Sequence, residues 1–261
     1  MIDFHNHLFP GVDDGAADLD ESRAALEAFR SQGVDTVVCT PHFRASLLER
    51  PAELAASLEA LDAAWEQLRA MAAAEFPEMT LGRGVEVTLD TPAPDFSDAR
   101  LRLNGTRFVL MEFPYFTIPP NVSTALFELR MGGWTPVIAH PERYTGLTDY
   151  EMVEEWKRMG AQLQVNCGSV VGSYGADAER HAHALLARGL VDYLGSDYHA
   201  RGRLHVRAAR EWLEARGAGE QAALLTEENP RRLLAGEAPI PVPAIVEEKR
   251  SFWSKLFGGR G

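Results

Sequence analysis

Short apolar runs alternate with longer amphipathic stretches along most of this chain. Runs of four to seven residues rich in Val, Ile, Leu and Phe predict buried β-strands. They lie at residues 2–5, 36–40, 81–87, 108–113, 136–139, 162–166 and 192–195. Helical spacing of the apolar residues predicts helices between them, at residues 19–31, 51–74, 123–131, 149–159 and 177–188. Asp18 precedes the first helix and forms a capping pattern with Glu21 three residues on, and Gly33 follows the helix.

This repeated strand–helix order predicts a single α/β domain with a parallel sheet. Polar residues follow nearly every predicted strand, as at the active-site end of a closed barrel. An open doubly wound sheet would instead concentrate them at one switch point. We therefore expect a barrel over residues 1–236, followed by a Pro-rich segment and a short basic and aromatic tail at residues 237–261.

The overall charge and the ends of the chain narrow the range of functions. A formal net charge of −12 argues against a nucleic-acid partner, because phosphate backbones bind basic surfaces. The first residues lack the basic and apolar regions of a secretory signal, and no apolar run approaches the length of a membrane span. The two cysteines match no disulfide or zinc pattern, so we expect a cytoplasmic protein.

Histidines and carboxylates gather where the predicted strands end. His5 and His7 alternate along the first strand, so both imidazoles can face one point. Glu86 and Glu112 follow apolar residues, and burying such a carboxylate without a partner costs several kcal/mol. Arginine partners are one solution, but metal ions account more simply for the full set of donors. That set has five histidines and four carboxylates: His5, His7, His42, His140 and His199, with Asp13 or Asp14, Glu86, Glu112 and Asp197.

Six ordered motifs resemble one known group of proteins. They are His-x-His followed by Gly-x-Asp-Asp-Gly, then Thr-Pro-His, Gly-x-Glu-Val, Glu-Phe-Pro, His-Pro-Glu-Arg-Tyr and Ser-Asp-x-His. This order resembles the polymerase-and-histidinol-phosphatase (PHP) superfamily, and more narrowly its capsule-associated tyrosine phosphatases of the CpsB/YwqE type. The resemblance runs from Met1 to about Leu234 and implies a distorted (β/α)7 TIM-like barrel that holds three divalent metal ions. Manganese is the ion expected from the family, with iron, zinc or magnesium as alternatives.

The resemblance also assigns ligands and catalytic residues. It places the first ion on His5, His7, Glu86 and Asp197, the second on Glu86, Glu112 and His140, and the third on Asp14, His42 and His199. Arg143 would grip the phosphate, and Asp197 or His199 would assist the leaving group. Arg201, Arg203 and Arg207 compete for the role of a second phosphate-binding arginine, and we select Arg203.

The resulting hypothesis is a phosphomonoester hydrolase in which a hydroxide shared by two metal ions attacks phosphorus. The substrate implied by the family is phosphotyrosine, in the tyrosine-rich tail of a bacterial kinase for polysaccharide export. A small-molecule phosphatase of the histidinol-phosphate type or a broader phosphoesterase is the alternative enzyme. A non-catalytic regulatory binding module is the alternative from another class. A cysteine-dependent phosphatase is excluded, because Ala45 and Ser173 stand six positions after the two cysteines, where arginine is needed.

Some residues outside the donor set have simpler explanations. His181 and His183 lie two apart on a predicted helix, so we expect surface residues. Cys39 and Cys167 are expected in the core. The tail at residues 247–261 is predicted to be disordered, to dock on its own barrel or on another subunit of a homo-oligomer, or to touch an anionic membrane surface.

Overall fold

The apolar runs form parallel strands in a computed structural model that describes residues 1–147 and 149–245. The strands are β1 (Ile2–Asp3), β2 (Thr36–Cys39), β3 (His42–Arg44), β4 (Thr80–Arg83), β5 (Glu86–Thr88), β6 (Phe108–Glu112), β7 (Thr135–Ala139), β8 (Gln162–Asn166) and β9 (Tyr193–Gly195). The predicted strand at residues 81–87 is in fact two strands, since the chain leaves the ladder at Gly84 and Val85. The sequence analysis missed β3, a three-residue strand directly after Pro41.

Two sheets divide these strands. One has the order β1-β2-β4 and the other β3-β5-β6-β7-β8-β9, and all the strand pairs are parallel. The sheets continue into each other, because β2 leads into β3 and β4 into β5 after two-residue interruptions. At the far edge the Asp197 amide donates to the His5 carbonyl at 2.8 Å, and the His7 amide donates to the Tyr198 carbonyl at 2.9 Å.

The predicted single α/β domain with parallel strands is therefore confirmed. The barrel is distorted: backbone hydrogen bonds connect the strand ends around a common mouth, but the described residues do not form one continuous closed ladder.

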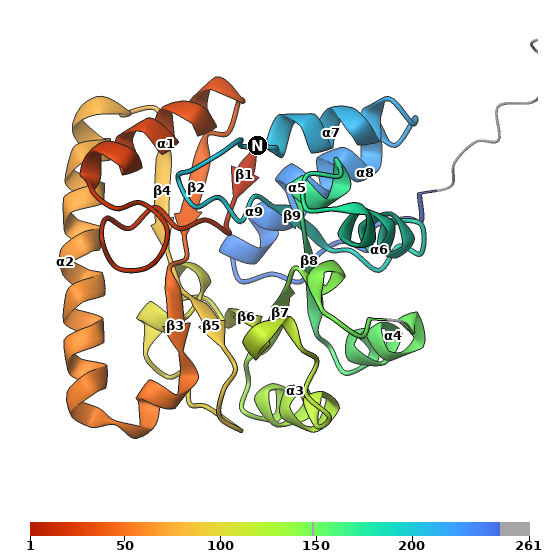
Figure 1. Cartoon of the computed structure of the whole chain (residues 1–261), viewed down its shortest axis with the longest axis horizontal. Coiled ribbons are helices and arrows are strands. Elements are labelled where there is room, and N and C mark those ends of the chain that lie inside the picture. The colour runs from red at the N-terminus through yellow and green to blue at the C-terminus, as the bar shows by residue number, and fades with distance from the viewer. Residues whose placement is uncertain (148, 246–261) are drawn as a thin grey trace, which may run out of the picture.

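Helices cover the outside of the strands (Figure 1). They are α1 (Leu19–Ser31), α2 (Pro51–Glu75), α3 (Val122–Met131), α4 (Tyr150–Arg158), α5 (Cys167–Val170), α6 (Ala176–Leu186), α7 (Val206–Glu214), α8 (Gly219–Ala223) and α9 (Asn229–Leu234). Local signals fix α1 at its predicted bounds. The Asp18 carboxylate accepts the amides of Asp20 and Glu21, Glu21 accepts the Ala17 amide, and Gly33 adopts a φ of +80° just beyond the helix.

Alternation along the strands separates two apolar clusters. In β6, Val109 and Met111 face the helices, whereas Phe108 and Leu110 belong to a smaller cluster in the interior. That inner cluster also contains Leu233 of α9, and α9 contacts β1. Side chains therefore fill the interior at the α9 end, and a functional site has room at the opposite end, where the strands finish.

The histidine pair and the cysteine pair outside the donor set differ in burial. His181 and His183 lie half-buried at the surface of α6: Tyr150 Oη lies 2.7 Å from His181 Nδ1, and the Val170 carbonyl lies 2.9 Å from His183 Nε2. Cys39 and Cys167 are buried and unpaired, as predicted for core residues.

The segment after residue 236 returns to the domain. Val242 and Ile245 are buried, and the Ile245 amide donates to the Leu186 carbonyl at 3.1 Å. The predicted tail at residues 247–261 lies outside the described residues, so its docking, membrane and subunit roles stay predictions. No helix in the described ranges combines the length and apolar character needed to cross a bilayer.

Candidate metal centre

Two buried histidines from the segment that follows β1 form the base of the site. His5 Nδ1 lies 2.6 Å from Gln164 Oε1, and His7 Nδ1 lies 2.7 Å from Asp13 Oδ2. Each Nδ1 therefore donates its proton to an oxygen of the protein, which leaves the Nε2 lone pair available. Neither Nε2 has a hydrogen-bond partner among the described residues. Both rings thus present a free donor atom to the same point.

Two carboxylates complete this first group. Glu86 is fully buried on β5, and its Oε1 and Oε2 lie 3.1 Å and 3.4 Å from Nε2 of His5 and His7 respectively. Asp197 Oδ1 lies 3.5 Å from each of the same two nitrogens. The other oxygen of Asp197 accepts hydrogen bonds from Arg143 Nη1 and Asn166 Nδ2, each at 2.7 Å. One carboxylate oxygen is thereby held by the protein, and the other faces the histidines.

Charge coupling within this group is strong. Burial alone would lower the pKa of His5, but the charges of Glu86 and Asp197 outweigh it and raise that pKa to about 9. Burial likewise opposes ionisation of Glu86, yet His5 and His140 hold its pKa well below the usual range. The four side chains therefore stabilise one another only when a positive charge is shared among them.

Two further groups adjoin the first. His7, Asp14, His42 and His199 form one, and His42, Glu86 and Glu112 form the other, with the ligand atoms of each group within 4.8 Å of one another. His42 faces both groups: its Nε2 lies 3.5 Å from Asp14 Oδ1, and its Nδ1 lies 3.2 Å from Glu86 Oε2. His140 Nε2 lies 3.0 Å from Glu86 Oε1 and 3.9 Å from Glu112 Oε2. All nine residues of the donor set predicted from the sequence therefore meet at one mouth.

The donors present fit divalent cations. Five of their buried atoms have no hydrogen-bond partner among the described residues: His5 Nε2, His7 Nε2, His42 Nδ1, His140 Nδ1 and Glu86 Oε2. Leaving such atoms buried without partners is costly, and cations bound to the donor groups would satisfy those of His5, His7, His42 and Glu86. Nitrogen and oxygen donors without thiolate suit manganese, iron, zinc or magnesium.

The backbone around the donors is strained or closely packed. His140 and Asp197 adopt φ values of +35° and +52°, which cost about 1–3 kcal/mol each in residues other than glycine. At Gly15 a Cβ atom would lie 2.0 Å from the His7 carbonyl oxygen, so glycine alone lets the loop after β1 fold back on His7. This loop brings Asp13 and Asp14 to the two sides of the histidines.

Arg143 lies beside the centre, within hydrogen-bond reach of Asp197. Of the three arginines considered for a second role, Arg201 Nη2 donates to the Gly15 carbonyl at 3.3 Å, next to Asp14. Arg207 donates instead to carbonyls of Ser31 and Gln32, at the end of α1. Arg203 is exposed and makes no hydrogen bond or ion pair with another described residue. The selection of Arg203 stays a prediction, and Arg201 lies closer to a donor of the centre.

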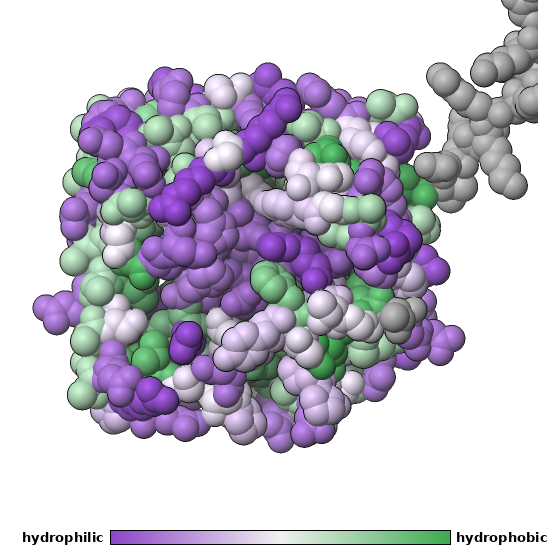
Figure 2. All heavy atoms as spheres, viewed as in Figure 1, coloured by the Kyte–Doolittle hydropathy of each residue, from purple (hydrophilic) through white to green (hydrophobic). Residues whose placement is uncertain are grey.

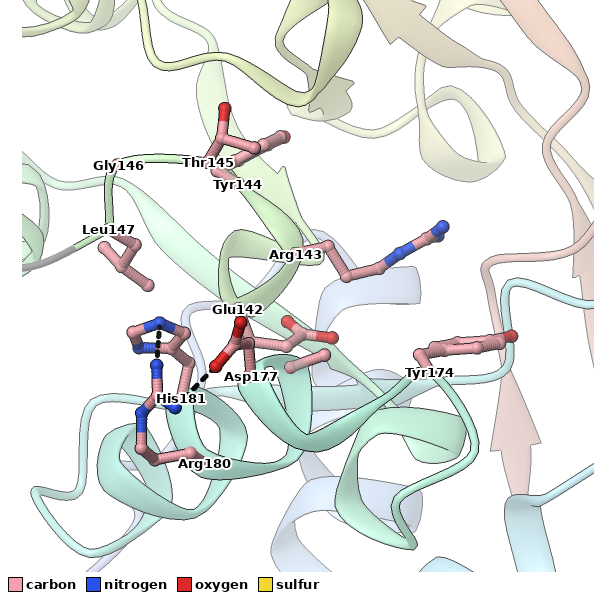
Figure 3. Close-up of a pocket in the computed structure, with 11 residues that line it drawn as sticks. Glu142, Arg143, Tyr144, Thr145, Gly146, Leu147, Tyr174, Asp177, Arg180 and His181 are labelled. Atoms are coloured by element: carbon pink, nitrogen blue, oxygen red, sulfur yellow. Dashed lines mark hydrogen bonds and ion pairs between the residues drawn. The ribbon is translucent and has the colours of Figure 1, made fainter.

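The mouth is open to solvent on one side. The molecule is hollowed near the middle of the face seen in Figure 1, and hydrophilic residues line that hollow (Figure 2). The side chain of Asp14 is 70% exposed, and those of His42 and His199 are 34% and 29% exposed. A cavity of about 420 Å³ also lies beside Arg143, bounded by residues 142–147, Tyr174 and His181 (Figure 3).

The residues that orient the donors were not assigned this role from the sequence. Asp13 belongs to the Gly-x-Asp-Asp-Gly motif, and its carboxylate accepts hydrogen bonds from His7 Nδ1 and from the His42 amide, the latter at 3.0 Å. Gln164 and Asn166 lie on β8 and connect His5 to Asp197 through a hydrogen bond of 2.9 Å between their amides. Their signal was available: polar residues alternating with apolar ones in a fully buried strand require partners.

Comparisons with known proteins agree over nearly the full length. The chain is 31% identical to the tyrosine-protein phosphatase YwqE of Bacillus subtilis, covering 99% of both proteins. It is 32% identical to the tyrosine-protein phosphatase CpsB of Streptococcus pneumoniae, covering 90% of this chain and 98% of that protein. A solved structure from the YwqE and CpsB pair, described as unique metal-dependent tyrosine phosphatases, matches with a TM-score of 0.78 and 28% identity. It covers 93% of this chain and 100% of the solved one.

The family model for capsular polysaccharide synthesis, CpsB/CapC, matches residues 1–235, which include every residue of the candidate centre. This chain is therefore a member of the CpsB/CapC family.

Proposed function

We propose that this protein is a metal-dependent tyrosine-protein phosphatase of capsular polysaccharide synthesis. The observation that carries the proposal is the convergence of His5, His7, Glu86 and Asp197 beside Arg143, with buried donor atoms that have no partner among the described residues. Full-length relatives named tyrosine-protein phosphatases support it. The expected partner is a phosphotyrosine protein, in particular the tail of a bacterial tyrosine kinase.

We assign three cation positions among these donors. The first would use His5, His7, Glu86 and Asp197, the second Glu86, Glu112 and His140, and the third Asp14, His42 and His199. Both His42 and His140 lie near the second position: His42 Nδ1 is 3.2 Å from Glu86 and 3.6 Å from Glu112, and His140 Nε2 is 3.0 Å and 3.9 Å from the same two carboxylates. Since one imidazole serves one ion at a time, assigning His42 to Asp14 and His199 leaves His140 for the second position. We expect manganese in this set.

Divalent cations bound there would supply positive charge beside the phosphate and acidify a water molecule, which is the chemistry that phosphomonoester hydrolysis requires. Arg143 contributes from the protein side. Its Nη1 donates to Asp197, and no other described residue accepts a hydrogen bond from its side chain, so its remaining N–H groups can bind phosphoryl oxygens and neutralise their charge in the transition state.

We assign His199 to metal binding through Nε2. Its Nδ1 donates to the Asp197 carbonyl at 3.0 Å, and burial is the main cause that lowers its pKa. The ring is therefore neutral near pH 7, with a lone pair on Nε2 facing Asp14 at 3.4 Å. A phenolate leaving group has a pKa of about 10 and needs less protonation than an alkoxide, so tyrosine phosphate suits a site without a strong acid.

The shape of the mouth supports a protein substrate rather than an enclosed metabolite. Asp14, His42 and His199 are all partly exposed, and the cavity beside Arg143 leaves room for residues that flank a phosphotyrosine.

The decisive experiment compares turnover of a phosphotyrosine peptide and of histidinol phosphate, with manganese added or chelated. We expect manganese-dependent turnover that favours the peptide. Arg143→Ala should lower kcat on the peptide by about 10²–10³-fold, because a preorganised transition-state donor is lost. Preference for histidinol phosphate would replace the proposal with a metabolite phosphatase. A His5 and His7 double alanine variant with full biological activity would indicate a non-catalytic binding module.

A further inference from the structure

Two aromatic rings enclose the guanidinium of Arg143. Its Cζ atom lies 4.6 Å from the ring centroid of Phe116 and 4.8 Å from that of Tyr174. Phe116 comes from the loop after β6, and Tyr174 from the connection between α5 and α6. Figure 3 shows Arg143 and Tyr174 directed to the same side, away from Leu147 and His181. Stacking on two rings holds the arginine in one orientation.

Both rings remain partly accessible to solvent. Phe116 is 36% exposed and Tyr174 is 40% exposed, although each packs against the arginine. Rings that only positioned Arg143 would not need aromatic surface exposed to solvent. Apolar surface beside a phosphate-binding cation is suited to contact a ligand that carries an apolar group next to its phosphate.

Phe116 connects the arginine to the candidate centre. Its ring centroid lies 5.5 Å from that of His140, so the ring extends from Arg143 to a proposed metal ligand. The Phe116 carbonyl accepts the Thr145 amide at 2.8 Å and the Thr145 hydroxyl at 3.0 Å. These bonds hold Phe116 at a φ of +50°, an unfavourable conformation for an aromatic residue and one that recurs at functional sites.

Tyr174 is seated by a glycine. A Cβ atom at Gly168 would lie 2.9 Å from the Tyr174 ring, so the absence of a side chain there lets the ring lie on α5. Burial raises the pKa of Tyr174 to about 12, so its hydroxyl is neutral beside a phosphate. Both aromatic residues are therefore fixed by specific backbone features.

We propose that the exposed parts of Phe116 and Tyr174 form an aryl-binding rim, which receives the phenyl ring of the phosphotyrosine while its phosphate reaches Arg143 and the metal centre. The inference rests on the proposed function and specifies how the site selects an aryl phosphate over an alkyl phosphate. Aromatic contacts of this kind correspond to a preference of roughly 2- to 12-fold per ring.

The first test compares p-nitrophenyl phosphate with β-glycerophosphate on the full-length, manganese-loaded protein. We expect Phe116→Leu to raise KM for the aryl phosphate by roughly 2- to 12-fold with little change in kcat, because a contact present before and during the reaction is lost. Its turnover of the alkyl phosphate should stay within about twofold, whereas Phe116→Ala also removes packing against Arg143 and should slow turnover of both substrates, the aryl phosphate more. The leucine variant retains apolar bulk against Arg143 and so separates ring recognition from arginine positioning.

Tyr115→Ala is the matched control. Tyr115 precedes Phe116 in the same loop and has a similar φ of +56°, but its side chain is 95% exposed. The control should leave both substrates unaffected. Equal losses on both substrates in Phe116→Leu, or a fall in its kcat alone, would show that the rings only position Arg143 and would overturn the proposal.

A binding experiment separates this inference from the proposed function. Calorimetry with phenylphosphonate and methylphosphonate requires no turnover. We expect the wild type to prefer the phenyl compound, and Phe116→Ala and Tyr174→Leu each to reduce that preference. Equal wild-type affinities for the two phosphonates refute the aryl-binding rim, whereas an absence of turnover with the phenyl preference intact refutes the phosphatase activity instead.

Discussion

Two buried carboxylates at opposite ends of the barrel strands are accommodated in different ways. Asp192, just before β9, accepts hydrogen bonds from Lys157 Nζ and from the Leu163 amide. Glu86, at the start of β5 and facing the mouth, has only histidines within ion-pair distance among the described residues. One of its oxygens has no hydrogen bond to a described residue. The first carboxylate is satisfied by the chain itself, and the second is complete only with a ligand.

The comparison shows how to distinguish structural from functional burial of charge. Burial raises the pKa of Asp192, and the ion pair with Lys157 offsets only part of this increase. At Glu86 the pKa is lowered because surrounding imidazoles share positive charge, an arrangement that a divalent cation can replace. Several unpartnered donor atoms that point to one place indicate a binding site, whereas a buried ion pair whose partners satisfy each other indicates a structural role.

The largest effect is expected from Glu86→Gln. Glu86 belongs to two of the three donor groups, so its loss should remove metal and lower phosphatase activity by more than about 100-fold, the upper value for residues that only support ligands. Elemental analysis measures the metal content, and phosphopeptide turnover measures the activity. Asp192→Asn is the matched control, and its metal content should equal that of the wild type. A full metal complement in Glu86→Gln would contradict the assignment.

A smaller effect is expected from Asp13→Asn. Asp13 accepts the proton of His7 Nδ1 and the amide of His42, and its own pKa is lowered through the hydrogen bond with His7 despite burial. Losing the carboxylate should weaken manganese affinity by about 10- to 100-fold, because the ring is no longer held in the required tautomer. Competition with a fluorescent chelator measures the dissociation constant. An unchanged constant would show that Asp13 does not orient His7.

Lys157→Met tests the ion pair between Lys157 and Asp192, at the end of the strands opposite the mouth. The substitution leaves Asp192 buried with one hydrogen-bond donor. Because the lysine side chain is 25% exposed, the loss of stability is limited. We expect the free energy of unfolding to fall by about 1–3 kcal/mol. Urea unfolding measures the change, while metal content and activity should stay at wild-type values. A loss of bound manganese would mean that the two ends are coupled.

The smallest effect is the dependence of stability on pH. The pKa of His5 rises from its ordinary value of 6.5 to about 9 in the folded chain, so its contribution to stability is fully present below pH 6.5 and is lost as pH rises through about 9. Manganese requires the neutral imidazole, so its stabilising effect should grow over the same interval. Thermal unfolding of chelated and manganese-loaded protein from pH 6 to 9 should therefore diverge. Parallel curves would contradict proton competition at the centre.

Local sequence signals determined much of this protein. The cap at Asp18 and the stop at Gly33 fix α1, because each involves residues one or two turns apart. Alternation along the segment after β1 places His5 and His7 on one side, and the order of the strands brings the predicted donors to one mouth. These features follow from short-range geometry, so they are readable from the chain alone.

Contacts between residues far apart in the sequence decided the remaining features of the fold and of the site. The strand predicted at residues 81–87 divides at Gly84, where a Cβ would lie 3.2 Å from the Arg102 carbonyl, and no local pattern records that approach. Gln164 orients His5 across 159 positions, and Phe116 and Tyr174 meet only at Arg143. The sequence specifies which donors exist and on which strand each lies. Only tertiary packing selects which neighbours orient them, because that depends on side-chain directions at contacts far apart in the chain.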